Sequence, residues 1–241
     1  MANFLIDKEK IQGNTAVLDG EILKHIKTVL RMKAGDGLTL CDGEGMFYDA
    51  VIRSLGESAE ADITSAYPAP TEPKLKITLF QAVPKNPKLE FIVQKATEIG
   101  VVEIIPVNTA RIVAKLEKDS KLERLRKIAR EAAAQSKRGV VPRVGECVSF
   151  AEAVRMAKEM DLAVIPYEDE HTTSIKECLR GRTAKTLALF IGPEGGFDEA
   201  EVALARENGL LAATLGPRIL RTETAGLVAA SICLYELGEM E

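Results

Sequence analysis

A glycine-rich turn with an acid at its centre is the stretch of the chain that points most directly to chemistry. It reads IGPEGG and runs from Ile191 to Gly196, with Glu194 in the middle. Phosphate-binding turns of this kind offer backbone N–H groups and often a lysine. A carboxylate here would oppose a pyrophosphate, at roughly 4 kcal/mol for two unit charges ~4 Å apart in an effective dielectric of 20. A ligand with positive charge, such as S-adenosylmethionine with its sulfonium and ammonium groups, suits the turn better.

A second turn, GPRILRTET from Gly216 to Thr224, has the same Gly-Pro start and also follows an apolar segment. Gly-Pro makes a sharp bend that exposes backbone N–H and C=O groups. A single Gly-Pro is more often a simple connection, but two of them, each leading from a strand to a helix, favour a ligand site. The carboxyl ends of parallel strands meet at one edge of a sheet, so we expect the two turns to converge on one ligand.

Few other residues suggest catalysis. The chain has two histidines, His25 and His171, and no G-x-S-x-G or H-E-x-x-H motif, which disfavours triad hydrolysis and zinc catalysis. Its four cysteines form no C-x-x-C pair and are expected to be small buried side chains rather than metal ligands or disulfides.

The composition is that of an ordinary soluble protein, with 241 residues, 46% hydrophobic and 28% charged. The N-terminal residues do not resemble a signal peptide, and no apolar run approaches the ~18 residues of a membrane-spanning helix. We therefore expect a cytoplasmic protein.

The net charge of -4 hides an uneven distribution. Between Arg111 and Arg138 there are ten basic and four acidic residues, whereas from Leu189 to the end there are nine acids and three arginines. A basic stretch in an acidic chain is typical of a surface that binds nucleic acid.

Prolines in YPAPTEP, Tyr67 to Pro73, indicate a linker between a domain at 1–70 and a domain at 74–241. In the first domain, the segments 37–42, 46–55 and 58–67 alternate apolar with polar residues, which predicts a small β-barrel or compact sheet. A helix over 21–31 interrupts it, with Ile22, Leu23, Ile26, Val29 and Leu30 on its apolar face.

The second domain alternates strands with helices, which predicts an α/β fold with a parallel sheet covered on both faces. The expected strands are 74–83, 101–107, 161–167, 186–192 and 209–216. The expected helices are 88–100, 121–136, one that Ser149 and Glu152 begin with a capping box, 198–208 and 223–237. The last helix is apolar nearly all round, so it is either central or shared with a second subunit.

The two turns together resemble the paired signatures of the bacterial 16S ribosomal RNA uracil-N3 methyltransferases, which belong to the SPOUT superfamily of knotted methyltransferases. Three more segments are similar to that family and occur in the same order: HIKTVLRMKAGD at 25–36, QKATEIGV at 94–101 and EAAAQSKRGVVP at 131–142. The N-terminal ANFLID departs from the family because it lacks the arginine often found before the first strand.

The resemblance implies a PUA-like β-barrel RNA-binding domain at 1–70 and a SPOUT domain at 74–241 whose C-terminal chain forms a trefoil knot. It implies S-adenosylmethionine as cofactor, N3 of a uridine in 16S rRNA of the small ribosomal subunit as target, a homodimer formed through the last helix, and no metal or membrane. The residues expected to bind the cofactor are Ile191, Gly192, Pro193, Glu194, Gly195, Gly196, Leu215, Gly216, Ile219, Leu220 and Thr222.

Methylation at N3 requires loss of a proton and creates an anion over N3, O2 and O4 of the uracil. Arg221 is the first candidate for the cation that stabilises this anion, and Arg218 is the second. Glu223 is a candidate base, although a glutamate in the first turn of a helix is favoured by the helix dipole alone, and water could take the proton instead. The residues expected to contact RNA are Lys24, His25, Lys27, Arg31, Lys33, Lys95, Arg124, Lys127, Lys137 and Arg138.

Two other functions fit the same residues. One is a SPOUT enzyme that methylates another base or a ribose 2′-oxygen. The other is an RNA-binding ribosome-assembly module that keeps the fold without the reaction.

Overall fold

The computed structural model describes residues 2–85, 87–112 and 119–240. Lys115, Glu117 and Lys118 of the basic stretch lie outside these residues. The chain divides into two compact units, one formed by Met1–Glu72 with Ala133–Val141 and the other by Pro73–Ala132 with Pro142–Glu241. The segment 133–141 therefore belongs to the first unit, whereas the sequence assigns it to the domain at 74–241.

The first unit is built on a six-stranded sheet in the order β1-β4-β5-β6-β3-β2. The strands are β1 (Ala2–Leu5), β2 (Ile11–Gln12), β3 (Thr15–Leu18), β4 (Gly37–Cys41), β5 (Met46–Leu55) and β6 (Ala59–Pro68). The strands predicted at 37–42, 46–55 and 58–67 are confirmed as β4, β5 and β6. Neighbouring strands are antiparallel except β1 and β4, which are parallel. Leu18, Leu38 and Ile52 are among the buried residues at its core.

The helix predicted at 21–31 changes its geometry midway. It begins as α1 (Gly20–Lys24), continues as a π-helix over His25–Leu30, and ends at Arg31 in a left-handed conformation with φ 53°. Of the five residues predicted on its apolar face, Ile26 is buried, but Val29 and Leu30 are 63% and 41% exposed. The wider π-turn has a longer repeat than an α-helix, so residues after Ile26 no longer continue the buried stripe.

The second unit contains a sheet with the order β10-β8-β7-β12-β11-β13, and β9 also pairs with β8. Its strands are β7 (Lys76–Ala82), β8 (Glu103–Asn108), β9 (Arg143–Val144), β10 (Val148–Ser149), β11 (Leu162–Pro166), β12 (Thr186–Ile191) and β13 (Leu211–Ala213). Every pairing in this sheet is parallel, as the alternation of strands and helices predicts.

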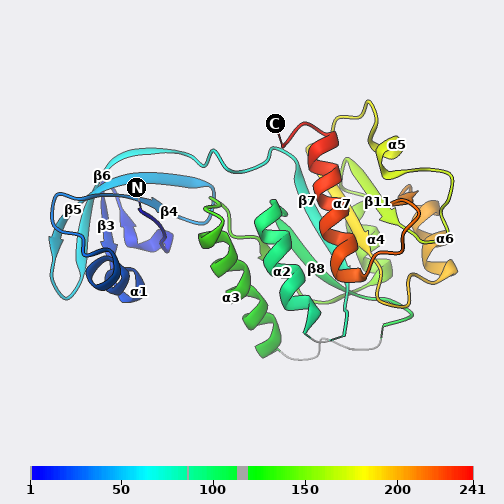
Figure 1. Ribbon diagram of the computed structural model, residues 1–241, viewed down its shortest axis with the longest axis horizontal. Coiled ribbons are helices and arrows are strands. Elements are labelled where there is room, and N and C mark those ends of the chain that lie inside the picture. The colour runs from blue at the N-terminus through cyan, green and yellow to red at the C-terminus, as the bar shows by residue number, and fades with distance from the viewer. Residues whose placement is uncertain (1, 86, 113–118, 241) are drawn as a thin grey trace. The chain divides into compact units, whose positions relative to one another are not determined.

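Helices cover both faces of this sheet. They are α2 (Lys88–Ile99), α3 (Asp119–Gln135), α4 (Phe150–Ala157), α5 (Ile175–Leu179), α6 (Glu199–Glu207) and α7 (Thr222–Glu236). Residues of α2, α3, α5 and α7 share one apolar core with the sheet, and residues of α4 and α6 share the other. α2 and α7 lie side by side on the first face (Figure 1). The predicted two-faced α/β arrangement is confirmed.

The helix ends follow local signals in the sequence. Gly100 ends α2 with φ 118°, and Ser149 accepts a hydrogen bond from the N–H of Glu152 at the start of α4. Ser174 and Asp198 form reciprocal capping boxes with Glu177 and Glu201, respectively, at the starts of α5 and α6. These caps place the starts of α4 and α6 where the sequence predicts them.

The last helix, α7, is only partly enclosed by its own chain. Ala229, Ala230 and Cys233 are buried in the core, Leu227 and Ile232 are half-buried, and Tyr235 is 67% exposed. Three of the four cysteines are buried and Cys147 is half-buried, as expected of small apolar side chains. Among the described residues, no helix combines the length and the apolar character needed to cross a membrane.

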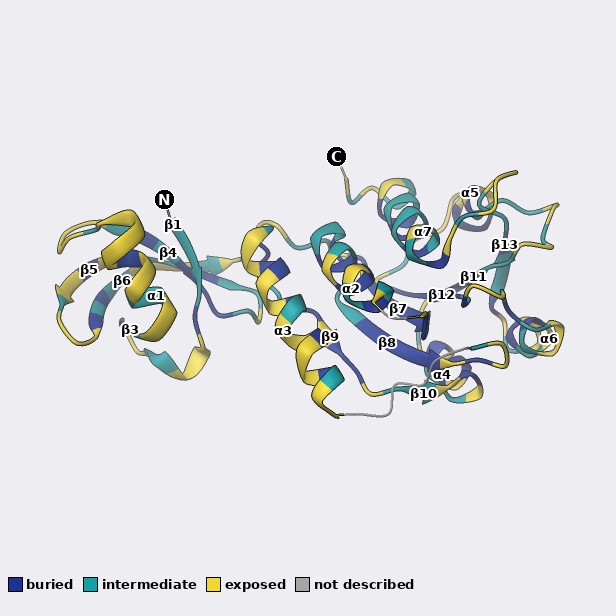
Figure 2. Cartoon of the chain, turned by 60° about the horizontal axis from the view of Figure 1, so that its bottom comes forward, coloured by how far each residue is buried: buried dark blue, intermediate teal, exposed yellow. Residues whose placement is uncertain are grey.

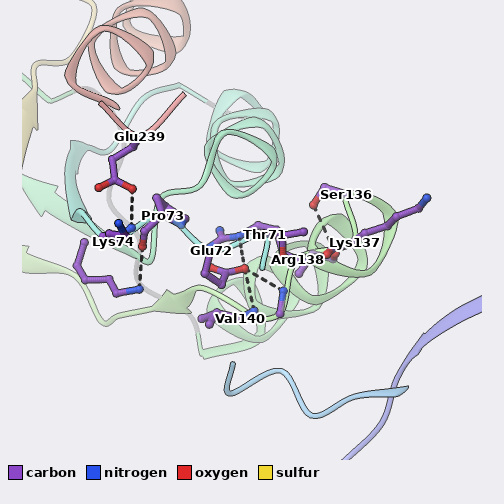
Figure 3. Close-up of polar contacts among 12 residues, drawn as sticks. Thr71, Glu72, Pro73, Lys74, Ser136, Lys137, Arg138, Val140 and Glu239 are labelled. Atoms are coloured by element: carbon purple, nitrogen blue, oxygen red, sulfur yellow. Dashed lines mark hydrogen bonds and ion pairs between the residues drawn. The ribbon is translucent and has the colours of Figure 1, made fainter. Parts of the chain in front are cut away.

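Arg138 forms a buried ion pair within the first unit, so its prediction as an RNA contact is wrong. Its guanidinium lies 2.6 Å from Glu72, and the two side chains are only 4% and 9% exposed. Glu72 also accepts hydrogen bonds from the backbone N–H groups of Gly139 and Val140, at 2.8 and 3.2 Å (Figure 3). A side chain at Gly139 would overlap that of Ala69. The contact that buries this arginine spans 66 residues of sequence, which is why local charge counting misses it.

Candidate functional site

The two Gly-Pro turns meet at a cavity of about 390 Å³ in the second unit, as predicted. The cavity lies beyond the carboxyl ends of β11, β12 and β13, the edge at which parallel sheets bind ligands. Every residue predicted to bind the cofactor lines it: Ile191, Gly192, Pro193, Glu194, Gly195, Gly196, Leu215, Gly216, Ile219, Leu220 and Thr222. Its volume is within the range that encloses a nucleoside-sized ligand.

A third segment, which sequence reasoning missed, also lines the cavity. Pro166, Tyr167, Glu168 and His171 follow β11 and contribute to the wall. The available signal was the predicted strand at 161–167, because its carboxyl end falls at the same edge of the sheet as the two turns. This segment lacks a glycine-rich turn, so it did not stand out in the sequence.

Glu168 and Gly196 lie in close contact at the cavity. Gly196 has φ +68°, a conformation that side chains rarely adopt, and a Cβ atom there would overlap the Glu168 carboxylate. The last glycine of IGPEGG is therefore required both for the backbone and for the space that Glu168 occupies. Glu168 is a second acidic residue in the cavity lining, in addition to Glu194.

Glu194 is fixed by the start of α2. Its carboxylate accepts hydrogen bonds from the backbone N–H of Lys85 at 3.2 Å and from the Lys88 ammonium at 3.1 Å. Burial alone would raise the pKa of this carboxyl, but hydrogen bonds from its own N–H, from Lys88 and from Lys85 outweigh it and hold the pKa below the ordinary 4.5. Glu194 therefore stays ionised at neutral pH.

Glu223 shares the same cation. Its carboxylate lies 3.1 Å from the Lys88 ammonium, in the first turn of α7, and it is not part of the cavity wall. Burial raises its pKa, but its own backbone N–H, Lys88 and the charge of Arg221 lower it to a net value below 4.5. A carboxylate with a lowered pKa is a weak base, which disfavours Glu223 as the group that removes a proton.

The two candidate arginines differ in position. Arg218 lines the cavity, is exposed, and forms no ion pair with any residue in the described part of the chain. Arg221 is the N-cap of α7 and is exposed, but it does not line the cavity. Arg218 is thus the better placed of the two to meet a ligand inside the cavity.

Arg111, in the segment that follows β8, contacts the glycine-rich turn that follows β12. Its guanidinium donates to the carbonyl of Gly195 at 3.2 Å and to the carboxylate of Asp198 at 3.3 Å. The N–H of Ala110 donates to Glu201 at 2.8 Å. The segment after β8 therefore holds the end of the turn and the start of α6.

The basic residues predicted to contact RNA lie on both units. In the first unit, Lys24, His25, Lys27, Arg31, Lys33 and Lys137 are exposed. In the second unit, Lys95, Arg124 and Lys127 pair with Glu98, Glu90 and Glu131, and the exposed stripe of α3 is visible in Figure 2. No cluster of histidine, cysteine and acidic side chains that could hold a metal ion occurs within residues 2–85, 87–112 and 119–240.

Comparison with known proteins agrees with the fold. Residues 71–234 match the model of the RNA methyltransferase domain, and residues 18–63 match the model of the RNA methyltransferase PUA domain. The fold and the site thus define an RNA methyltransferase with an N-terminal PUA domain. More narrowly, the chain belongs to the family of ribosomal RNA small subunit methyltransferase E.

Relatives with that name cover nearly the whole chain. The Bacillus subtilis protein is 36% identical, over 96% of this chain and 94% of its own length. The Mesomycoplasma hyopneumoniae protein is 33% identical, over 98% of this chain and all of its own length. The family predicted from the two turns and the three further segments is confirmed as that of small subunit ribosomal RNA methyltransferases.

Two solved structures of similar proteins contain the expected cofactor. The ribosomal RNA small subunit methyltransferase E from Neisseria gonorrhoeae, bound to S-adenosylmethionine, is 32% identical with a TM-score of 0.83, and the match covers 98% of this chain and 97% of that one. A methyltransferase from Legionella pneumophila, also bound to this cofactor, is 32% identical with a TM-score of 0.80, over 97% and 96% of the two chains. S-adenosylmethionine is therefore the cofactor of close structural relatives.

Proposed function

We propose that this protein transfers a methyl group from S-adenosylmethionine to N3 of a uridine in 16S rRNA of the small ribosomal subunit. The observation that carries this proposal is that both Gly-Pro turns line the same cavity. The relatives named as small subunit rRNA methyltransferases support the rRNA target, and those with bound S-adenosylmethionine support the cofactor. The choice of uracil N3 rests on the resemblance of the sequence motifs.

The cavity suits this cofactor in size and in chemistry. Ile191, Leu215 and Leu220 offer apolar walls for an adenine ring, and the neighbouring main chain offers polar groups. Glu168 and Glu194 give the cavity the negative charge that a sulfonium and an ammonium favour. When bound, S-adenosylmethionine supplies an electrophilic methyl group on a cationic sulfur.

The residues of the chain have to favour the uracil anion and hold it in place. Loss of the N3 proton spreads negative charge over N3, O2 and O4, and a guanidinium aimed at these oxygens stabilises it. Arg218, exposed at the cavity wall, takes this role, and Arg221 supports it from the start of α7. Because Glu223 is a weak base held by Lys88, the proton leaves to solvent water and Glu223 instead fixes the position of α7.

The same proposal includes the assembly that the family resemblance implies. The C-terminal chain, from the turn at 191–196 through α7, forms a trefoil knot, which is a rare exception among folds. Two copies associate through α7, whose half-buried Leu227 and Ile232 and exposed Tyr235 supply apolar surface. The exposed cations of both units contact rRNA phosphates, and the protein works in the cytoplasm, where its substrate is found.

A reconstitution experiment tests the proposal. Small ribosomal subunits from a strain without the related enzyme are incubated with the protein and methyl-labelled S-adenosylmethionine, and the nucleosides of the 16S rRNA are mapped by mass spectrometry. We expect 3-methyluridine at one position and none with the Arg218→Gln variant. A label on another base or on a ribose would replace the N3 assignment with the alternative SPOUT reaction. No labelling together with no cofactor binding would leave only the non-catalytic module.

A further inference from the structure

Two consecutive hydrogen bonds connect β7, in the middle of the sheet, to the two Gly-Pro turns, at 191–196 and 216–224, that line the cavity. Gln81, near the carboxyl end of β7, is completely buried, and its side-chain Nε2 donates to the hydroxyl of Thr222 at 2.9 Å. The Thr222 hydroxyl lies 2.6 Å from the carbonyl oxygen of Gly192. Thr222 and Gly192 line the cavity on its two opposite turns, whereas Gln81 does not reach it.

The direction of these hydrogen bonds is fixed by chemistry. Gln81 Nε2 also lies 3.1 Å from the carbonyl oxygen of Ala82, which can only accept, so the amide must present its NH₂ group on this side. The Thr222 hydroxyl has one proton. Since it accepts from Gln81, that proton goes to Gly192. The Gly192 carbonyl oxygen can only accept, so the hydroxyl donates to the turn and the Gln81 amide supplies the hydrogen bond that the hydroxyl accepts.

The buried position of the Gln81 amide costs folding free energy. A buried amide without full hydrogen bonding is destabilising, and among the described residues Gln81 Oε1 has no hydrogen-bond partner. It faces Gly226 of α7, where a Cβ atom would lie 3.4 Å from it. Strand neighbours of Gln81 are Ile191 and Pro106, so an apolar residue would be the ordinary choice at this position.

We propose that Gln81 is a positioning residue for cofactor binding: through the Thr222 hydroxyl it fixes the distance between the turn at 191–196 and the start of α7, and hence the width of the cavity. This inference rests on the proposed function of the cavity. Gln81 does not line the cavity, and it acts through Thr222 and Gly192. Gln81, which supports the two turns, therefore lies on a strand more than 100 residues before Thr222 in the chain.

The first test compares two substitutions of Thr222 in the full-length protein. Thr222→Val removes the hydroxyl and keeps the shape, while Thr222→Ser keeps the hydroxyl. Calorimetry with S-adenosylmethionine should show a dissociation constant about tenfold higher for Thr222→Val, the size of one lost hydrogen bond, and a value within about threefold of the original protein for Thr222→Ser. Equal binding by the original protein and Thr222→Val would overturn the inference, as would equally weak binding by both variants.

The second test asks whether Gln81 acts through Thr222. Gln81→Met keeps the volume of the side chain without its NH₂ group and should also weaken binding by about tenfold. Because the bonds act in series, the double variant Gln81→Met/Thr222→Val should bind about as weakly as either single variant. A double variant that is about a hundredfold weaker would show two independent effects and overturn the relay.

A matched control separates this role from general stability. Thr78→Val removes a buried hydroxyl from the same strand, but its hydrogen bond goes to Glu103 rather than to a cofactor turn. It should lower the thermal midpoint and leave the dissociation constant unchanged. A rise in the dissociation constant for Thr78→Val as large as that for Gln81→Met would reduce Gln81 to a structural residue. If the original protein itself binds no S-adenosylmethionine, the proposed function fails rather than this inference.

Discussion

Glu194 and Glu223, which belong to different Gly-Pro turns, are joined by one cation. The ammonium of Lys88 lies 3.1 Å from each carboxylate. The hydrogen bond to Glu194 and the ion pair with Glu223 raise the pKa of Lys88, so the cation is retained throughout the physiological range. Lys88 is the first residue of α2, where the helix dipole disfavours a positive charge. The negative charges of Glu194 and Glu223 compensate for this unfavourable interaction of Lys88 with the helix dipole.

Replacing Lys88 should weaken cofactor binding in a pH-dependent way. In Lys88→Met the two carboxylates lose their shared cation, and burial, which raises both pKa values, is less opposed. At pH 8 both acids are charged and unpaired, and their repulsion moves the two turns apart, so we expect a dissociation constant for S-adenosylmethionine at least tenfold above that of the original protein. Because the pKa values of both carboxyls rise when Lys88 is lost, this difference should be smaller at pH 5.5 than at pH 8. Calorimetry at the two pH values measures it.

The control for Lys88 is Lys176, which pairs with Glu236 at the opposite end of α7. Lys176→Met removes an ion pair from the same helix without touching a cofactor turn. Its dissociation constant should equal that of the original protein at both pH values. A difference for Lys88→Met that is independent of pH would argue against the shared-cation account.

The glycine at position 196 should be irreplaceable for a reason beyond backbone strain. Gly196→Ala combines an unfavourable φ of +68° with overlap of the Glu168 carboxylate. Gly209→Ala is the matched control, because its φ is +86° and a Cβ atom there meets nothing within 4 Å. Each variant should lose about 1–2 kcal/mol of unfolding free energy from the left-handed backbone alone.

Only Gly196→Ala should lose cofactor binding, since Glu168 must then leave its place at the cavity. Denaturant unfolding and calorimetry on the two variants distinguish these effects. Unchanged cofactor affinity in Gly196→Ala would mean that the position of Glu168 is unimportant for binding.

Acid should destabilise the segment after β11 that lines the cavity, because it protonates Glu170. Hydrogen bonds from the Thr172 hydroxyl and from the N–H groups of Thr172 and Thr173, helped by Arg206, lower the pKa of this carboxyl from 4.5 to about 2. A lowered folded-state pKa stabilises the protein fully above the unfolded value, and this stabilisation is lost as the pH falls from about 4.5 towards 2.

The measurement is urea unfolding at pH 6 and pH 3 with Glu170→Gln beside the original protein. The original protein should be the more stable at pH 6, and the difference should shrink at pH 3. Glu207→Gln, which alters an exposed acid on α6, is the control. A constant difference between Glu170→Gln and the original protein across this range would contradict the account.

Breaking the buried ion pair of the first unit should be costly. Arg138→Met leaves the Glu72 carboxylate buried without its cation, and we expect a loss of about 3–5 kcal/mol of unfolding free energy. Arg124→Met, at an exposed pair with Glu90, should cost less than about 1 kcal/mol. The double variant Glu72→Gln/Arg138→Met should recover part of the loss. Denaturant unfolding of all three measures it, and equal losses for Arg138→Met and Arg124→Met would contradict the buried pair.

The sequence predicts those features that depend on local pattern. Strands alternating with helices indicated the parallel sheet, and two strands that end in Gly-Pro indicated turns that meet, because carboxyl ends of parallel strands share an edge. The residues predicted for the cofactor therefore line one cavity. Their roles stay predictions, as do those of Arg218, Arg221 and Glu223.

Features that depend on distant partners could not be read from the sequence. Gln81 looks like any polar residue in a strand until Thr222, 141 positions later, is seen beside it. Arg138 belongs to a basic stretch, and only the burial of Glu72 shows that it faces inward. The π-turn at His25–Leu30 has no recognisable pattern, so the exposed Val29 and Leu30 were assigned to the apolar face.

The first unit is assembled from two stretches of chain, Met1–Glu72 and Ala133–Val141, and the charged pair in Figure 3 joins them. A graft of residues 1–72 onto another scaffold would deliver an incomplete module with a carboxylate lacking its cation. Exchange of the first unit between relatives must carry both stretches, because each contributes one side chain of the buried ion pair.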